Sequence, residues 1–230
     1  MANGIRDKLK ANLDAVEARI VQACQRAGRR REDVTLVTVT KTVSSEVADI
    51  AVDLGLRDLA ENRPQELWRK ADHVAGATWH LIGHLQRNKI ERTLPLVQLI
   101  HSVDSERLLH ALESEATSDV SVMLEVNASG ETSKQGFAPA DVLALVPRLL
   151  DLRRVSIRGL MTMAAYQEPA ACRPTFAMLR LLRDQLRNAL TPSHEVRFLS
   201  MGMSNDFEIA IEEGATHIRL GTVLFEGVTS

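Results

Sequence analysis

Apolar and polar positions along the chain follow two periodicities. From Ile5 to Ala27, apolar residues recur every three or four positions with charges between them, which predicts an amphipathic helix. From Val34 onward, short runs rich in valine, leucine and isoleucine alternate with stretches of helical periodicity. The apolar runs predict strands over 34–40, 56–62, 78–84, 98–104, 120–127, 156–163, 196–203 and 217–225. The stretches between them predict helices over 44–55, 63–74, 86–97, 105–116, 139–152, 171–190 and 205–214, the third of them bent or ended at Pro95.

This order of about eight strands alternating with helices predicts parallel pairing with helical crossovers. The length of 230 residues is close to the roughly 250 residues of a typical (β/α)8 barrel. A doubly wound open sheet is the alternative, but no GxGxxG turn follows the first strand. No linker divides the chain, so we expect a single α/β domain over residues 1–230, a TIM-type barrel with an extra N-terminal helix.

Composition narrows the range of partners. The net charge of −2 and the aromatic content of 3% give no basis for a nucleic-acid partner. No signal peptide or membrane-length apolar run is present, and the two cysteines lie far apart, so we expect a cytoplasmic protein without disulfides. The seven histidines show no metal-ligand spacing. A monomer is the simpler expectation, with a dimer as the alternative.

Polar residues gather where the predicted strands end. In a (β/α)8 barrel, active sites form at the C-terminal ends of the strands, so residues far apart in sequence would converge there. Those residues are Lys41, Glu61, Asn62, His84, Ser102, Asp104, Glu125, Asn127, Thr162, Ser200, Ser204, Arg219 and Thr222.

Lys41 ends the first core strand, where an unpaired charge is expensive. Burial at the barrel mouth would favour its neutral amine, and a neutral amine can attack a carbonyl to form a Schiff base. Two ligands fit this chemistry: a carbonyl substrate, as in a Schiff-base aldolase, or the aldehyde of pyridoxal phosphate.

The end of the chain favours the second ligand. "LSMGMSNDFEIAIEEG" predicts a strand, a glycine turn and a helix N-terminus, and "RLGTVLF" adds a glycine and a hydroxyl one strand later. Barrels often bind phosphate after strands seven and eight, which neighbour strand one in a closed barrel. Arg219, two residues before Gly221, could contact a pyridine nitrogen and, being always cationic, would leave it unprotonated.

With these residues in this order, the chain resembles the pyridoxal phosphate homeostasis proteins, which are single-domain relatives of the alanine racemase N-terminal barrel. The resemblance runs through nearly the whole chain, in the segments "VTVTKTVS", "AENRPQEL", "WHLIGHLQRNK", "VNASGETSKQGF", "RGLMTM" and "LSMGMSNDFEIAIEEGATHIRLGT". It departs from the family after the last strand, where Glu226 interrupts the usual Phe-Gly pair.

The resemblance implies pyridoxal 5′-phosphate bound as a Schiff base on Lys41, with Asn62 near the ring and Arg219 at the pyridine nitrogen. It implies phosphate contacts from Ser200 or Ser204 together with Gly221 and Thr222, and a secondary cofactor-handling role for Lys89 and Lys134.

Carrier and enzyme remain two different hypotheses. Racemisation needs proton transfer on both faces of the substrate, which alanine racemase provides with a lysine and a tyrosine from a second domain. Tyr166 is the only tyrosine here, and an arginine at the ring nitrogen makes a weak electron sink. The resemblance therefore implies a non-catalytic protein that controls cofactor homeostasis and supplies apo-enzymes transiently. A slow amino-acid racemase or lyase is the alternative, and a cofactor-free aldolase is the third hypothesis.

Overall fold

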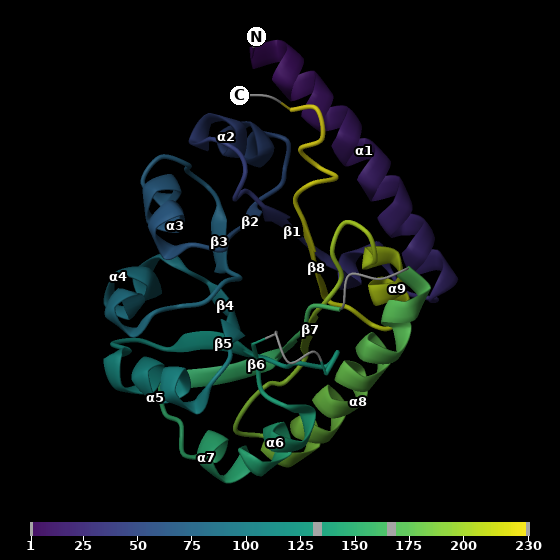
Figure 1. Cartoon of the computed structure of the whole chain (residues 1–230). Helices are drawn as coiled ribbons and strands as arrows, with labels where there is room; N and C mark the ends of the chain where they lie inside the picture. The colour runs from purple at the N-terminus through teal and green to yellow at the C-terminus, as the bar shows by residue number, and fades with distance from the viewer. Residues whose placement is uncertain (1, 131–134, 165–168, 229–230) are drawn as a thin grey trace.

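The predicted strands form one closed barrel. The computed structural model describes residues 2–130, 135–164 and 169–228. Eight strands pair in parallel in chain order, and β8 closes on β1 (Figure 1). The bounds are Thr35–Val39 (β1), Asp58–Glu61 (β2), Thr78–Leu81 (β3), Leu99–Val103 (β4), Val120–Glu125 (β5), Val155–Met161 (β6), Phe198–Ser200 (β7) and His217–Leu220 (β8). The barrel is confirmed, and the open sheet is wrong because β1 and β8 pair.

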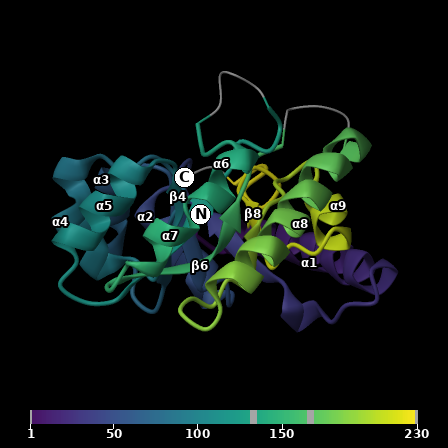
Figure 2. The same cartoon turned by 90° about the horizontal axis from the view of Figure 1, so that it is seen from below.

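Helices surround the barrel on its outside (Figures 1 and 2). The α-helices are Ala2–Arg26 (α1), Ser45–Asp53 (α2), Pro64–Ala71 (α3), Ile90–Thr93 (α4), Glu106–Glu115 (α5), Pro139–Ala144 (α6), Val146–Leu150 (α7), Arg173–Leu190 (α8) and Phe207–Glu212 (α9). Short 3₁₀ turns cover Arg31–Asp33 (η1), Arg87–Lys89 (η2), Leu94–Leu96 (η3) and Pro169–Cys172 (η4). The extra N-terminal helix, α1, lies outside the barrel against α9. Among the described residues, none of the helices has the length and apolar character needed to cross a membrane.

Two helical segments are interrupted in the structure. The segment over 86–97, predicted to bend or end at Pro95, forms η2, α4 and η3, and the segment predicted as one helix over 139–152 divides into α6 and α7. Pro95 stands in the first turn of η3 and Pro147 in the first turn of α7. Proline lacks an N–H donor and its ring clashes with the preceding turn, so helical segments restart at these positions.

Alternation along each strand divides the apolar residues between two cores. Val37 and Val39 of β1 pack with Ala60 of β2 in a small cluster, which fills part of the barrel interior. Leu36 belongs instead to the large cluster shared with the helices, as does Leu67 of α3. The same alternation turns Asp58, His80, His101, Ser200, His217 and Arg219 inward.

Candidate functional site

One cavity at the barrel mouth collects six of the seven residues expected to bind the cofactor. Its volume is about 320 Å³, and the sequence-predicted residues in its wall are Lys41, Asn62, Ser204, Arg219, Gly221 and Thr222. The other residues of the wall are Val39, Thr42, Ile82, Gly83, Met163 and Met203. The cavity lies at the C-terminal ends of β1, β2, β3 and β8 and at the loops after β6 and β7. The convergence expected from the strand ends therefore occurs on this side of the mouth.

Lys41 lies beyond the strand and not within it. β1 ends at Val39, Thr40 is the last buried residue, and the Lys41 side chain is exposed. The expectation of a buried Lys41 is therefore wrong, because the strand delivers the lysine to the rim of the cavity. Thr40 is the last buried residue of this segment, and the Lys41 side chain is in contact with water.

A buried ion pair holds the backbone just before Lys41. Lys70 of α3 is 1% exposed and donates hydrogen bonds of 2.5 Å both to the Glu61 carboxylate and to the carbonyl oxygen of Thr40. The Thr40 hydroxyl donates to the same Glu61 oxygen at 2.7 Å, and the Thr40 N–H donates to the Ala60 carbonyl at 3.0 Å. Sequence reasoning missed Lys70, whose only signal was a lysine on the apolar side of a predicted helix. This cluster positions the chain that carries Lys41.

Arg219 of β8 is the buried cation of the cavity wall. It is 4% exposed, and its guanidinium donates to the Ser200 hydroxyl at 2.6 Å and to the Thr162 carbonyl at 3.0 Å. Burial lowers the pKa of Arg219 to about 10, while Glu125 and Asp206 act in the opposite direction. The group thus stays charged near neutral pH and has donors fixed on two acceptors.

Ser200, the seventh predicted residue, does not line the cavity. It is fully buried, and its hydroxyl is occupied by Arg219 and by His101 Nδ1 at 2.7 Å. Ser200 therefore lies beneath the arginine, inside the barrel.

The loops after β7 and β8 touch beside the cavity. The Val223 N–H lies 3.4 Å from the Ser204 hydroxyl, and both Gly221 and Thr222 face the same space. A Cβ at Gly221 would lie 3.0 Å from the Val39 carbonyl oxygen, so glycine allows β8 to approach β1 closely here. The expected helix N-terminus contributes less, because α9 has six residues and the Met203 N–H already donates to Asp206. On this side the wall of the cavity consists of Met203, Ser204, Gly221 and Thr222.

Asn62 sits where β2 and β3 almost touch. A Cβ at Gly83 would lie 2.2 Å from the Asn62 carbonyl oxygen, so only glycine fits. The Ser102 hydroxyl donates to the Gly83 carbonyl at 2.7 Å and holds the same segment from β4. Asn62 is thereby placed on the cavity wall between the ends of β1 and β3, two strands away from Arg219 of β8 in the barrel order.

A group of titratable residues lies on the far side of the mouth. The His84 ring lies 2.9 Å from the Asp104 carboxylate, and Glu125 at the end of β5 is 6% exposed. Burial, followed by the nearby Asp104 charge, raises the pKa of Glu125 to about 7, against the opposing effects of Arg219 and His84. These residues do not line the cavity, yet Glu125 acts electrostatically on its arginine.

The remaining predicted residues lie elsewhere. Lys89 is in η2 and is absent from the cavity wall. Lys134 and Tyr166 lie outside the described residues. Within the described ranges, no group of three or more histidine, cysteine, aspartate or glutamate side chains could hold a metal ion.

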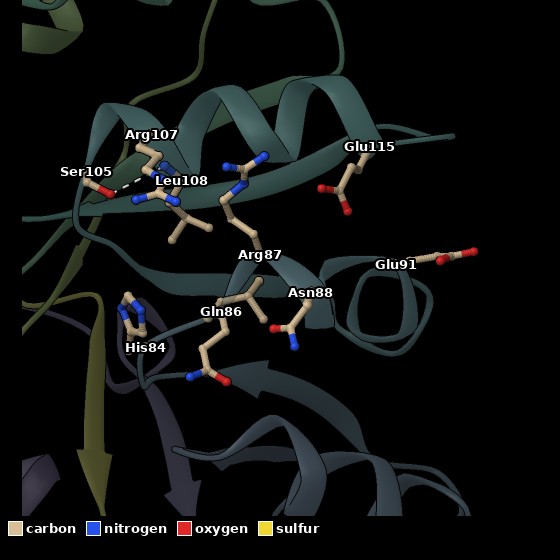
Figure 3. A pocket seen from close by; sticks show the side chains of 10 residues that line it. His84, Gln86, Arg87, Asn88, Glu91, Ser105, Arg107, Leu108 and Glu115 are labelled. Atoms are coloured by element: carbon tan, nitrogen blue, oxygen red, sulfur yellow. Dashed lines mark hydrogen bonds between the residues drawn. The ribbon is translucent and has the colours of Figure 1, made fainter.

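A second, larger cavity of about 770 Å³ lies between the segment after β3 and α5 (Figure 3). Arg87 extends from that segment toward α5, and Leu108 points from the helix into the same space. Its other lining residues are His84, Leu85, Gln86, Asn88, Glu91, Ser105, Arg107 and Glu115. None of the seven predicted residues is in its wall, so size alone does not make it the cofactor site.

Comparison with known proteins agrees with this geometry. Residues 11–228 match the family model of the alanine racemase N-terminal domain, so the fold and the lysine at its mouth define a barrel of that class. A pyridoxal phosphate homeostasis protein of Aquifex aeolicus is 41% identical over 219 residues, which cover 93% of this chain and 95% of that protein. The chain therefore belongs to the pyridoxal phosphate homeostasis protein family, and the resemblance seen in the sequence is confirmed.

Two solved structures are similar along most of the chain. A protein of unknown function from Bifidobacterium adolescentis superposes with a TM-score of 0.90 at 37% identity, and covers 96% of each chain. PipY of Synechococcus elongatus PCC7942, solved with PLP bound, gives a TM-score of 0.77 at 33% identity, covering 90% of this chain and 99% of PipY.

Proposed function

We propose that this chain is a single-domain cytoplasmic protein that binds pyridoxal 5′-phosphate at the barrel mouth as a Schiff base on Lys41. By doing so it controls the free cofactor pool and supplies apo-enzymes. The observation that carries the proposal is the meeting of Lys41, Arg219 and the Ser204–Gly221–Thr222 side around one cavity of about 320 Å³. A related structure with PLP bound supports the same ligand.

Each residue would have a distinct role in holding the cofactor. The Lys41 nitrogen would bond to the aldehyde carbon, and the aldehyde oxygen would leave as water. The Ser204 hydroxyl and the Gly221–Thr222 turn would hold the phosphate, and Arg219 would donate to the ring nitrogen. Asn62, Met163 and Met203 would flank the ring, because they share the wall of the same cavity.

The geometry favours reversible binding of the cofactor over catalytic turnover of a substrate. Arg219 has no acceptor atom and is already fixed by Ser200 and Thr162, so it would leave the ring nitrogen unprotonated. The exposed Lys41 can exchange its ligand with solvent amines. Both properties suit reversible storage of a reactive aldehyde and its release to another protein.

Borohydride trapping tests the binding. The purified protein is loaded with pyridoxal phosphate, freed of excess ligand, reduced with borohydride and mapped by mass spectrometry. We expect a yellow imine band that disappears on reduction, with the label on Lys41. Lys41→Ala should lose both, whereas Lys10→Ala, at an exposed site of α1 outside the cavity wall, should keep both. A Lys41→Ala protein that retains the colour and a stoichiometric load would contradict the proposal.

Glu125 is the observation that favours an enzyme as the second candidate. Its pKa of about 7 would let it accept or donate a proton at the mouth near neutral pH. A slow racemase or lyase would then exchange the α-proton of an amino acid with deuterated water faster than free cofactor does, and Glu125→Gln would lower that rate. A carrier would show no such excess, and would instead activate an apo-enzyme when loaded.

A further inference from the structure

A line of polar side chains crosses the barrel interior beneath Arg219. Ser200 of β7, His101 of β4 and His80 of β3 are all buried, at 3% exposure or less. The line ends at Asp58 of β2, whose side chain is 38% exposed. Imidazoles inside an apolar barrel are costly unless they are hydrogen-bonded, so this placement calls for a function.

The contacts along the line are continuous. Arg219 Nη1 lies 2.6 Å from Ser200 Oγ, and Ser200 Oγ lies 2.7 Å from His101 Nδ1. His101 Nε2 lies 3.0 Å from His80 Nδ1. His80 Nε2 lies 3.1 Å from Asp58 Oδ1. Four successive hydrogen bonds thus connect the cavity wall to the start of β2 at the opposite end of the barrel.

Arg219 can only donate, so Ser200 accepts from it, and Asp58 can only accept, so it fixes the direction of the remaining bonds when both imidazoles are neutral. The Ser200 hydroxyl then gives its own proton to His101 Nδ1. A neutral His101 then carries its proton on Nε2 and donates it to His80 Nδ1. His80 in turn carries its proton on Nε2 and donates it to the Asp58 carboxylate, which can only accept. With both imidazoles neutral, each donor has an acceptor and no proton is left over.

A third imidazole packs beside the line. The His217 ring centroid lies 5.8 Å from that of His101 and 6.4 Å from that of His80, and its Nδ1 is 2.9 Å from the Thr216 hydroxyl. Burial lowers the pKa of His217 to about 3, with His80 as the next cause. Burial, then His80, His217 and Arg219, also lower the pKa of His101 well below its ordinary value. His101 and His217 are therefore neutral near pH 7, and the proposed direction adds a neutral His80.

We propose that Ser200, His101 and His80 are positioning residues, which form a one-way hydrogen-bonded relay that fixes Arg219 against the cofactor ring and ties it to Asp58. The role toward the ring rests on the proposed function. The direction of the relay is a property of the protein alone, so it can be tested with no cofactor present.

Imidazole ¹⁵N spectra of the cofactor-free protein test the direction of the relay. Two-bond nitrogen–proton correlations distinguish the Nδ1–H tautomer, the Nε2–H tautomer and the charged ring. At neutral pH we expect His101 and His80 both as Nε2–H tautomers. A protonated ring, or an Nδ1–H tautomer at His101, overturns the relay. The spectra need no substitution, so the outcome does not depend on a variant that folds.

Cofactor retention tests the role of the relay. Ser200→Ala and His101→Leu each remove one link, and we expect each to weaken retention of pyridoxal phosphate about tenfold and to shift its absorbance band. His101→Gln should restore most of the affinity, because an amide can accept with its oxygen and donate with its nitrogen. Ser114→Ala and His110→Leu change exposed residues of α5 and should behave as wild type.

The outcomes separate the two proposals. If the wild-type protein binds no pyridoxal phosphate, the proposed function fails, while the tautomers still decide the relay. If the wild-type protein binds pyridoxal phosphate and neither Ser200→Ala nor His101→Leu changes its affinity or absorbance, the positioning role is wrong. If His101→Gln is as weak as His101→Leu, the imidazole acts through packing and the relay is likewise overturned.

Discussion

Glu125 is a carboxyl group that the fold places inside the barrel mouth, in the field of Asp104. Burial raises its pKa to about 7, so near neutral pH it carries a proton for much of the time. Arg219 and His84 oppose the shift without cancelling it. The charge of the mouth therefore becomes less positive as the pH rises through neutrality.

We expect Glu125 to make the protein less stable as the pH rises. Between the ordinary pKa of 4.5 and about 7, the folded protein holds a proton that the unfolded chain has lost, so the free energy of unfolding falls over this window and is level above it. The fall is at most about 3 kcal/mol. Denaturant titrations near about pH 5 and about pH 8 measure it. Glu125→Gln should flatten the difference, whereas Glu115→Gln, at an exposed site on α5, should leave it in place. If Glu125→Gln loses as much stability between these two pH values as the wild-type protein does, the pH dependence does not come from Glu125.

The sequence predicted which residues lie at the ends of the strands, but not how deeply each side chain is buried in the barrel. Position along a strand placed Lys41, Asn62 and Arg219 at the mouth, because parallel strands end at one face of a barrel. It did not show that Lys41 passes the rim or that Ser200 lies beneath Arg219, since both depend on the stagger of neighbouring strands. The histidines were equally hidden, because His80, His101 and His217 share no spacing in the sequence and meet only when β3, β4 and β8 are closed into a barrel.

At the scale of elements, the end of β1 is tied to β2 and α3 by the Thr40–Glu61–Lys70 cluster. Glu61 is fully buried, and one of its carboxylate oxygens has no hydrogen-bond partner among the described residues. The other oxygen accepts from both Thr40 and Lys70. The cluster therefore depends on Lys70 for the balance of a buried charge.

Lys70→Met should lower the free energy of unfolding by about 3–5 kcal/mol, because it leaves the Glu61 carboxylate buried without its counter-ion. The double variant Lys70→Met, Glu61→Leu removes both charges and should recover most of that loss. Equilibrium denaturation compares the three proteins. If Lys70→Met alone loses less than about 1 kcal/mol, the Lys70–Glu61 ion pair contributes no more than a surface ion pair does.

The contact between the ends of β2 and β3 gives a second test at this scale. Gly83→Ala would place a Cβ 2.2 Å from the Asn62 carbonyl oxygen, and backbone must move to relieve it. We expect a loss of about 2 kcal/mol or more in stability and weaker binding of pyridoxal phosphate, since Asn62 shares the cavity wall. Gly4→Ala, in α1 with no atom within 4 Å of the added Cβ, should be neutral or slightly stabilising in thermal unfolding. If Gly83→Ala and Gly4→Ala have equal effects, the close contact between Gly83 and the Asn62 carbonyl oxygen is not the cause of the lost stability.

Elements as a whole followed from the sequence more closely than their ends. Periodicity identified every strand of the barrel and the helices between them, because burial on both faces leaves continuous apolar runs. The sequence predicts the break at Pro95 but not the one at Pro147. A helical periodicity continues across a proline even when the hydrogen bonds do not.

At the scale of the whole molecule, α1 joins the two ends of the described chain. The Asn12 side chain donates to the carbonyl oxygens of Leu224 and Glu226, at 2.8 and 2.9 Å. Leu224 and Phe225 are buried, and their amides both donate to the Gly221 carbonyl. The tail from Leu224 to Glu226 is thereby held by α1, together with the glycine turn of the cavity.

Asn12→Ala should destabilise the turn at Gly221, although Asn12 does not contact the cavity itself. Both hydrogen bonds to the tail are lost, and we expect the free energy of unfolding to fall by about 1–2 kcal/mol relative to Asn188→Ala. Asn188 is exposed within α8, so its replacement makes the same change in helix propensity without a tertiary contact. Amide hydrogen exchange should be faster at Leu224 and Phe225 in Asn12→Ala than in the control. Because Gly221 belongs to the cavity wall, pyridoxal phosphate should also dissociate faster from this variant. Unchanged exchange at both amides would mean that the tail is held by its buried side chains alone, and that the N-terminal helix does not support the Gly221–Thr222 side of the cavity.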